Sequence, residues 1–130
     1  MILDTNVIIR IMQGNPEVIR TVDRLEKKQV GLNVSLITVY ELYHSLERVS
    51  NPDKRQRTIE AVLDSKPKYP TDEAVMKKAG RIDGRLTANG REIGAVDTII
   101  AATAIIHEEP VLTENVKHFE RVDGLSVETY

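Results

Sequence analysis

The stretch Gly94-Ala95-Val96-Asp97-Thr98-Ile99-Ile100-Ala101-Ala102-Thr103-Ala104-Ile105-Ile106 carries a single charge in an otherwise almost wholly apolar run. It is long enough for three helical turns and has no polar face, so it predicts a central helix packed on several sides. It is too short to cross a bilayer, which takes roughly 20 apolar residues. An ionised carboxylate in such a core is costly unless it is paired, hydrogen-bonded or bound to a cation. Asp97 is therefore a candidate for chemistry, although the helix dipole also stabilises a carboxylate in a first turn.

Length and composition indicate one folded domain over residues 1–130, with 41% hydrophobic and 29% charged residues. The chain has no cysteine, which excludes disulfides, thiolate metal sites and a cysteine nucleophile. Asp4 stands where a signal peptide would continue its apolar segment, and we expect a cytoplasmic protein with no membrane segment. The net charge of −2 gives no global attraction to nucleic acid, so an RNA partner needs a local basic patch.

Short apolar runs alternate with helical patterns along the chain. The strands are expected near residues 1–4, 31–37, 111–113 and, as an edge strand, 125–127. The helices are expected near residues 7–12, 16–28, 38–49, 53–65, 71–89, 94–106 and 116–119. Strands separated by helices favour parallel pairing, so the predicted fold class is α/β, a three-layer α/β/α sandwich with a central, mostly parallel sheet.

Polar side chains gather near the carboxyl ends of the predicted strands, where ligands bind in parallel sheets. Asp4 ends the first strand, Thr113 ends another, and Glu114 and Asn115 follow Thr113 directly. Glu41 and Asp97 lie near the starts of helices that open on the same rim. We therefore expect several remote acids to share one crevice.

Each acid also has a simpler explanation. Glu41 follows Thr38 at the spacing of a capping box, and Asp4 could cap the helix after it. Independent caps, however, do not need to meet at one end of one sheet. Carboxylates that do meet must raise their pKa values or hold a divalent cation, and a set of oxygen ligands suits Mg²⁺ or Mn²⁺ rather than zinc.

Four stretches together resemble the signature blocks of PIN-domain ribonucleases, most closely the VapC-type toxins of toxin–antitoxin pairs. In chain order they are Leu3-Asp4-Thr5-Asn6-Val7, Thr38-Val39-Tyr40-Glu41-Leu42, the stretch from Gly94 to Ala104, and Val111-Leu112-Thr113-Glu114-Asn115-Val116-Lys117-His118-Phe119. Any one block is a weak signal, but four in this order span the whole chain and are specific.

The resemblance implies that Asp4, Glu41 and Asp97 bind the catalytic metal and that Asn6 and Thr113 border the site. The family often has a fourth acid at the position of Asn115, which here stands beside Glu114. It also often has an Asp where this chain has His118. We therefore expect a second metal to bind weakly or only with substrate, while Asn115 can still offer a neutral oxygen ligand.

The function implied by the resemblance is metal-dependent hydrolysis of single-stranded RNA by a homodimer that a VapB-like antitoxin silences. Four cations could guide RNA, contact the antitoxin or form a solvated helix face, namely Lys77, Arg81, Arg85 and Arg91. No histidine has ligand spacing, so none is assigned to the metal.

Two other functions stay open from the residues. The missing fourth acid is compatible with a catalytically weak, metal-binding interaction module of the same fold. A phosphorylated receiver domain shares the layered fold and acidic pocket, but it needs paired acids after its first strand. Here Asp4 is followed by Thr5, which argues against a receiver domain.

Overall fold

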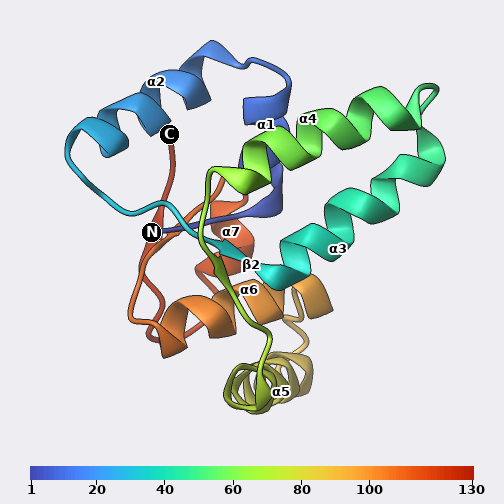
Figure 1. Ribbon diagram of the computed structural model, residues 1–130. Helices are drawn as coiled ribbons and strands as arrows, with labels where there is room; N and C mark the ends of the chain where they lie inside the picture. Colours follow the sequence, from blue (N-terminus) through green and yellow to red (C-terminus); the bar gives the residue numbers. More distant parts are fainter.

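The structure, a computed structural model, describes residues 1–130 and alternates short strands with helices (Figure 1). The strands are β1 (Ile2–Leu3), β2 (Val34–Ser35), β3 (Lys68–Tyr69), β4 (Val111–Leu112) and β5 (Val127–Glu128). The helices are α1 (Thr5–Met12), α2 (Pro16–Lys27), α3 (Leu36–His44) with a 3₁₀ turn at Ser45–Arg48, α4 (Pro52–Asp64), α5 (Glu73–Ala88), α6 (Ala95–Ile106) and α7 (Val116–Phe119). None of the helices is long and apolar enough to span a membrane.

All the strand pairings are parallel. One sheet has the order β1-β4-β5, and β2 pairs with β3. A parallel bridge between Ile2 and Asn33 joins the two sets, which gives the order β3-β2-β1-β4-β5. The strand ends that precede the candidate acids therefore meet at one edge, as the sequence predicted, and β5 is the predicted edge strand.

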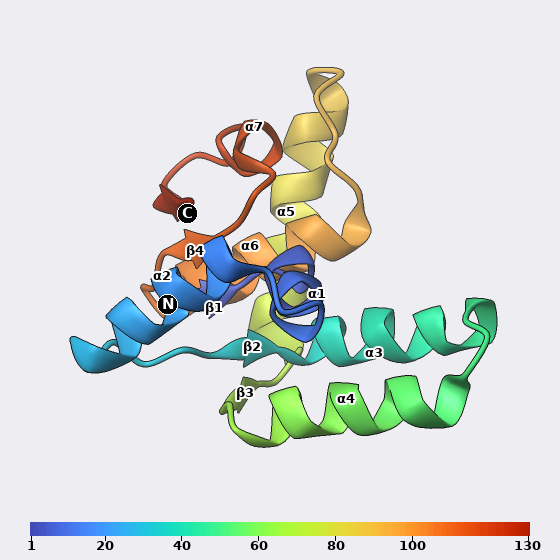
Figure 2. The same ribbon diagram turned by 90° about the horizontal axis from the view of Figure 1, so that it is seen from above.

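Helices cover both faces of the sheet, because neighbouring residues of a strand point to opposite sides. Ile2 and Val111 belong to a core with α5 and α6, whereas Leu3 and Leu112 belong to a second core with α1, α2 and α4. Figure 1 shows α1 and α2 on one side of the sheet and α5 and α6 on the other. The three-layer α/β fold is thus confirmed. In Figure 2, α3 and α4 project together from the body of the molecule.

The predicted central helix is confirmed as α6, in which residues 98–104 are all buried. Gly94 is its N-cap residue, with φ 96° and ψ 155°, and it supplies no capping side chain. This backbone conformation is open to glycine and strained for other residues. The glycine therefore lets the chain turn sharply into α6 and sets where Asp97 begins the helix.

The boundaries around β2 differ from the prediction. The strand expected over residues 31–37 is only Val34–Ser35, and α3 begins at Leu36 instead of Thr38. The reason is local, because the Ser35 hydroxyl accepts a hydrogen bond from the Ile37 N–H and caps the helix early.

The remaining boundaries shift by a few residues. Asp4 caps α1, so this helix starts at Thr5. The last strand lies at Val127–Glu128, slightly beyond the predicted 125–127. The segment Lys68–Tyr69, which the sequence pattern did not assign, forms β3 beside β2.

Candidate active site

Asp4 is the most buried of the candidate acids, with 2% of its surface exposed. It lies at the end of β1, where its Oδ1 accepts the Thr5 N–H at 2.8 Å. Its Oδ2 accepts the hydroxyl of Thr113, which follows β4, at 2.7 Å. Asp4 therefore does two things at once, capping α1 and presenting a fixed carboxylate at the sheet edge.

The charge environment of Asp4 includes two of the other candidate acids. Burial raises the pKa of Asp4 to about 6, and the hydrogen bonds from Thr113 and Thr5 only partly oppose this. The negative charges of Asp97 and Glu41 raise the pKa further. Asp4 is therefore close enough to Asp97 on α6 and to Glu41 on α3 to interact with both electrostatically.

Asp97 lies in the first turn of α6, with 23% of its side chain exposed. Its Oδ2 is 3.3 Å from Nδ1 of His118 on α7, and Nδ1 is also 2.8 Å from the Asn115 side-chain nitrogen. Burial raises the pKa of Asp97, and the contact with His118 opposes that rise. The segment after β4 thus brings His118 to Asp97 and Asn115 to His118. Sequence reasoning gave His118 no role, although its position, where relatives often carry an acid, was a usable signal.

Glu41 lies on α3, partly exposed, at the rim of the site. The capping-box explanation for Glu41 is wrong, because the cap of α3 is Ser35. The Thr38 hydroxyl instead meets the Thr5 hydroxyl at 2.9 Å in the interior and ties α3 to the start of α1. This buried contact, which the sequence did not reveal, fixes the helix that carries Glu41 against the strand that carries Asp4.

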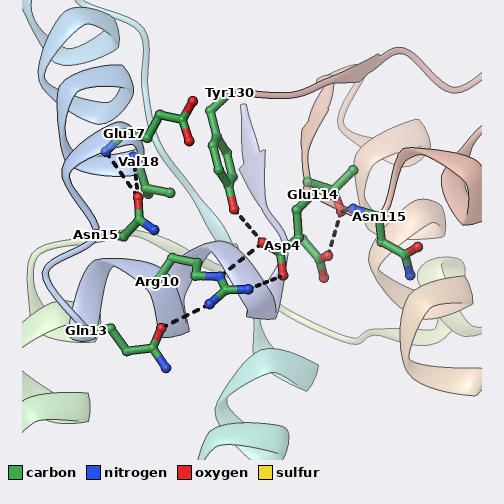
Figure 3. Close-up of polar contacts among 10 residues, drawn as sticks. Asp4, Arg10, Gln13, Asn15, Glu17, Val18, Glu114, Asn115 and Tyr130 are labelled. Atoms are coloured by element: carbon green, nitrogen blue, oxygen red, sulfur yellow. Dashed lines mark hydrogen bonds and ion pairs between the residues drawn. The ribbon is translucent and has the colours of Figure 1, made fainter.

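Of the residues predicted to border the site, Thr113 is fully buried and binds Asp4, while Asn6 is exposed on α1. The Glu114 carboxylate accepts hydrogen bonds from Arg10 Nε at 3.1 Å and from the Tyr130 hydroxyl at 2.5 Å (Figure 3). The Tyr130 bond, followed by the Arg10 bond, lowers the pKa of Glu114. Glu114 therefore ties α1 to the C-terminal segment beside the site.

The four predicted cations do not form one continuous row on the surface. Lys77 pairs with Glu73 at 3.1 Å on a highly exposed face of α5, and Arg81 is exposed without an ion pair. Arg85 and Arg91, in contrast, line one small pocket near α7. The structure therefore separates Lys77 and Arg81 from the other two.

The side chains fit a hard divalent cation by their chemistry, since Asp4, Asp97 and Glu41 offer carboxylate oxygens and Asn115 an amide oxygen. A buried carboxylate with a pKa near 6 and two neighbouring acids is the environment that a cation relieves. By themselves, no three His, Asp or Glu side chains of the structure form a group that could hold a metal ion. Water or substrate must then supply a large share of the ligands, as Mg²⁺ commonly requires.

Residues 1–125 match the family model of the PIN domain. The chain belongs to the PIN-domain family. This PIN domain is 30% identical over 128 residues to the tRNA(fMet)-specific endonuclease VapC of Shigella flexneri, covering 98% of the chain and 96% of the relative. The predicted resemblance to the VapC ribonucleases is therefore confirmed, and the receiver domain is excluded.

Solved structures agree with this assignment. The PIN domain is similar to DNA-bound VapBC from Salmonella typhimurium, with a TM-score of 0.88, 28% identity and coverage of 98% of this chain and 96% of that chain. It is also similar to VapBC-1 from nontypeable Haemophilus influenzae, with a TM-score of 0.85, 30% identity and the same coverage.

Proposed function

We propose that this chain is a metal-dependent endoribonuclease that hydrolyses phosphodiester bonds of single-stranded RNA, as the toxin of a VapBC-type pair. The observation that carries the proposal is the buried Asp4 carboxylate, whose raised pKa reflects burial and the nearby charges of Asp97 and Glu41. Membership of the VapC ribonucleases supports RNA as the substrate.

Asp4, Asp97 and Glu41 would hold one Mg²⁺ or Mn²⁺ ion. When bound, such an ion polarises the scissile phosphate, lowers the pKa of a water and offsets charge in the transition state. The set has three negative charges because Asn115 is neutral, which favours one ion over two before substrate binds.

The other residues orient these groups. The Thr113 hydroxyl and the Thr5 N–H fix both oxygens of Asp4, so the carboxylate cannot rotate away from the sheet edge. His118 holds Asp97 from the side of α7. The Asn115 amide contacts His118 and would be able to hydrogen-bond a water or a phosphate oxygen at the site.

Partners follow from the relatives. A similar structure from Mycobacterium tuberculosis is described as a member of the VapBC family of toxin–antitoxin systems. We propose that a VapB-like antitoxin binds this chain, that the active form is a homodimer and that the protein works in the cytoplasm. The relatives from Shigella and Salmonella are named for tRNA(fMet), which makes tRNA the first RNA to test.

The test is RNA cleavage by the purified protein with Mg²⁺ or Mn²⁺, with and without chelator, and by Asp97→Asn. We expect cleavage that chelator stops, 5′-phosphates on the downstream products, and a rate at least about 100-fold lower in Asp97→Asn, since removing a group that stabilises transition-state charge has effects of this order. Asp53→Asn, which neutralises an exposed first-turn acid on α4, is the matched control and should cleave normally. Wild-type rates in Asp97→Asn would refute the assignment.

A catalytically weak interaction module is the second candidate. It is favoured by the neutral Asn115 and by the lack of a complete three-ligand group. Failure of the wild-type protein to cleave tRNA or unstructured RNA with either metal, while it still binds an antitoxin, would decide for this alternative.

A further inference from the structure

A small pocket with an excess of positive charge lies at the C-terminal half of α5. It has a volume of about 120 Å³ and is bordered by the C-terminal half of α5, the loop before α6 and the segment after α7. The charged residues of the pocket are four cations and one acid, namely Lys78, Arg85, Arg91, Arg121 and Asp123.

The cations of this pocket have no ion-pair partners. Lys77 and Arg10 form side-chain ion pairs elsewhere on the molecule, whereas none of the four pocket cations has a carboxylate within 4.0 Å. Like charges gathered in one hollow repel one another, and an anion that enters the hollow relieves this repulsion. The pocket is therefore built for a negatively charged group.

Arg121 is held in place for such a group. Its Nη1 donates to the backbone carbonyls of Arg91 at 3.4 Å and Glu92 at 3.2 Å. Its Nε and Nη2 have no hydrogen-bond partner within the protein. A guanidinium with one side anchored and the other side free is suited to the fork-like contacts that arginine makes with phosphate oxygens.

The dimensions of the pocket favour a single charged group. Pockets for whole small molecules usually measure roughly 300–1,000 Å³, and this one is well below that range. Its apolar lining consists of the buried side chains Ile82, Leu86 and Val122.

Two short stretches of chain link the pocket to the carboxylate site. His118 on α7 contacts Asp97, and Arg121 follows it by three residues. Arg91 precedes Asp97 by six residues in the loop that leads into α6. The chain therefore connects the cations to Asp97 both through α7 and through the loop that leads into α6.

We propose that this pocket binds a non-scissile phosphate of the substrate RNA, close to the phosphodiester that is cleaved. The inference rests on the proposed function and extends it. An acidic site repels a polyanion, so a neighbouring cationic pocket is needed to draw the strand in and set its register. A regularly spaced polyanion can occupy both sites at once, which an isolated carboxylate of a protein partner cannot do.

The test is RNA binding in the presence of chelator, which prevents cleavage, measured by fluorescence anisotropy with 5′-labelled tRNA and with a short mixed-sequence single strand. We expect Arg85→Ala and Arg91→Ala each to raise Kd about fivefold or more at low salt. The double variant should flatten the dependence of log K on log salt by about 0.7, the contribution of one phosphate in a single strand. Arg85→Lys should restore part of the affinity.

Arg81→Ala is the matched control, because Arg81 is an exposed arginine on the same helix outside the pocket. It should bind RNA within twofold of the wild type. Equal Kd values for Arg81→Ala and the two pocket variants would overturn the proposal. Normal RNA affinity with lost antitoxin binding in the pocket variants would overturn it too, in favour of a protein ligand.

Cleavage assays separate this inference from the proposed function. If the wild type cleaves RNA and the pocket variants raise KM without lowering kcat, both stand. Unchanged KM in these variants, with normal cleavage, rejects the pocket and leaves the nuclease. RNA binding through the pocket without any cleavage rejects the nuclease and leaves the pocket as an RNA site.

Discussion

At the level of single residues, Asp4 has a structural role as the cap of α1 and a chemical role in the candidate active site. Its carboxylate is 2% exposed, and its pKa rises from 3.8 to about 6 on folding. The folded state then binds this proton more tightly than the unfolded state, so the contribution of Asp4 to stability is greatest at low pH and is lost as the pH rises from about 4 through 6. Above pH 6 the loss is about 3 kcal/mol, because one pKa unit is worth about 1.4 kcal/mol.

Asp4→Asn should therefore be more stable than the wild type in the absence of metal. Asparagine keeps an oxygen for the Thr5 N–H and removes the charge, so we expect the free energy of unfolding at pH 8 to rise by about 1–3 kcal/mol. At pH 4 the two proteins should differ little. Urea denaturation in the presence of chelator at both pH values measures the difference in stability. A variant no more stable than the wild type at pH 8 would show that the charged Asp4 carboxylate does not destabilise the fold.

The sequence predicted the acids better than their surroundings. Asp4 and Asp97 stand out because each is a charge next to an apolar run, and that signal survives without any structure. The contact of His118 with Asp97 depends on how α7 packs, and local pattern does not encode it. Likewise, the hydrogen bond from Tyr130 to Glu114 joins residues that are 16 positions apart, and it depends on where the last strand places Tyr130.

At the scale of the element, the start of α6 depends on Gly94. Its φ of 96° and ψ of 155° lie in a region that side-chain-bearing residues rarely adopt, yet an added Cβ would touch nothing within 4 Å. The cost of a substitution is therefore conformational and not steric. This turn sets where Asp97 enters the site.

Gly94→Ala and Gly80→Ala should have opposite effects on stability. Gly94→Ala forces a strained backbone and should lower the free energy of unfolding by about 1–3 kcal/mol, with a loss of RNA cleavage because Asp97 shifts. Gly80 lies inside α5, where a Cβ also meets nothing, so alanine should add about 0.5–1 kcal/mol. Denaturant unfolding compares the pair, and a stabilising Gly94→Ala would disprove the role given to this turn.

Helices were easier to predict than strands in this chain. Long amphipathic patterns identified α2 and α5, and a long apolar run identified α6, each to within about two residues, whereas each strand holds only two residues. Over so few residues, an alternation of apolar and polar side chains does not distinguish a strand from the start of a helix. The sequence pattern therefore predicted a strand over residues 31–37, although α3 begins inside this segment. The sequence of Lys68–Tyr69 alone does not indicate a strand, because β3 forms only by pairing with β2.

At the scale of the whole molecule, one sheet separates two apolar cores. Ile100 of α6 and Ile59 of α4 are both fully buried, one in each core. The two cores share β1 and β4, whose neighbouring residues alternate between them. The layers should consequently fold and unfold as one unit.

Ile100→Ala and Ile59→Ala test this unity. Each change removes a buried side chain and leaves a cavity, so each should cost about 2–5 kcal/mol. Both variants should still unfold in a single transition, seen alike by calorimetry and circular dichroism. A variant that melts in two steps, with one core lost before the other, would show that the cores are independent.

The layered topology follows from the alternation of strands and helices, and the four signature blocks narrowed it to the PIN domain. The sequence did not predict which charged side chains pair or gather on the surface. The spacing of Lys77, Arg81 and Arg85 suggested one row, but pairing with Glu73 takes Lys77 out of it, while Arg121 joins Arg85 from a remote segment.

The central claim is that Asp4, Glu41 and Asp97 share one divalent ion, and direct metal binding tests it without reference to activity. Mn²⁺ titrated into the purified protein should bind with a stoichiometry of one per chain, measured by electron paramagnetic resonance of the free ion. Asp4→Asn, Glu41→Gln and Asp97→Asn should each weaken binding at least about tenfold, because even the loss of a group that only orients a ligand costs about tenfold or more, and Asp53→Asn should not. Binding of Mn²⁺ that all three variants leave unchanged, or no binding by the wild type, would contradict the account.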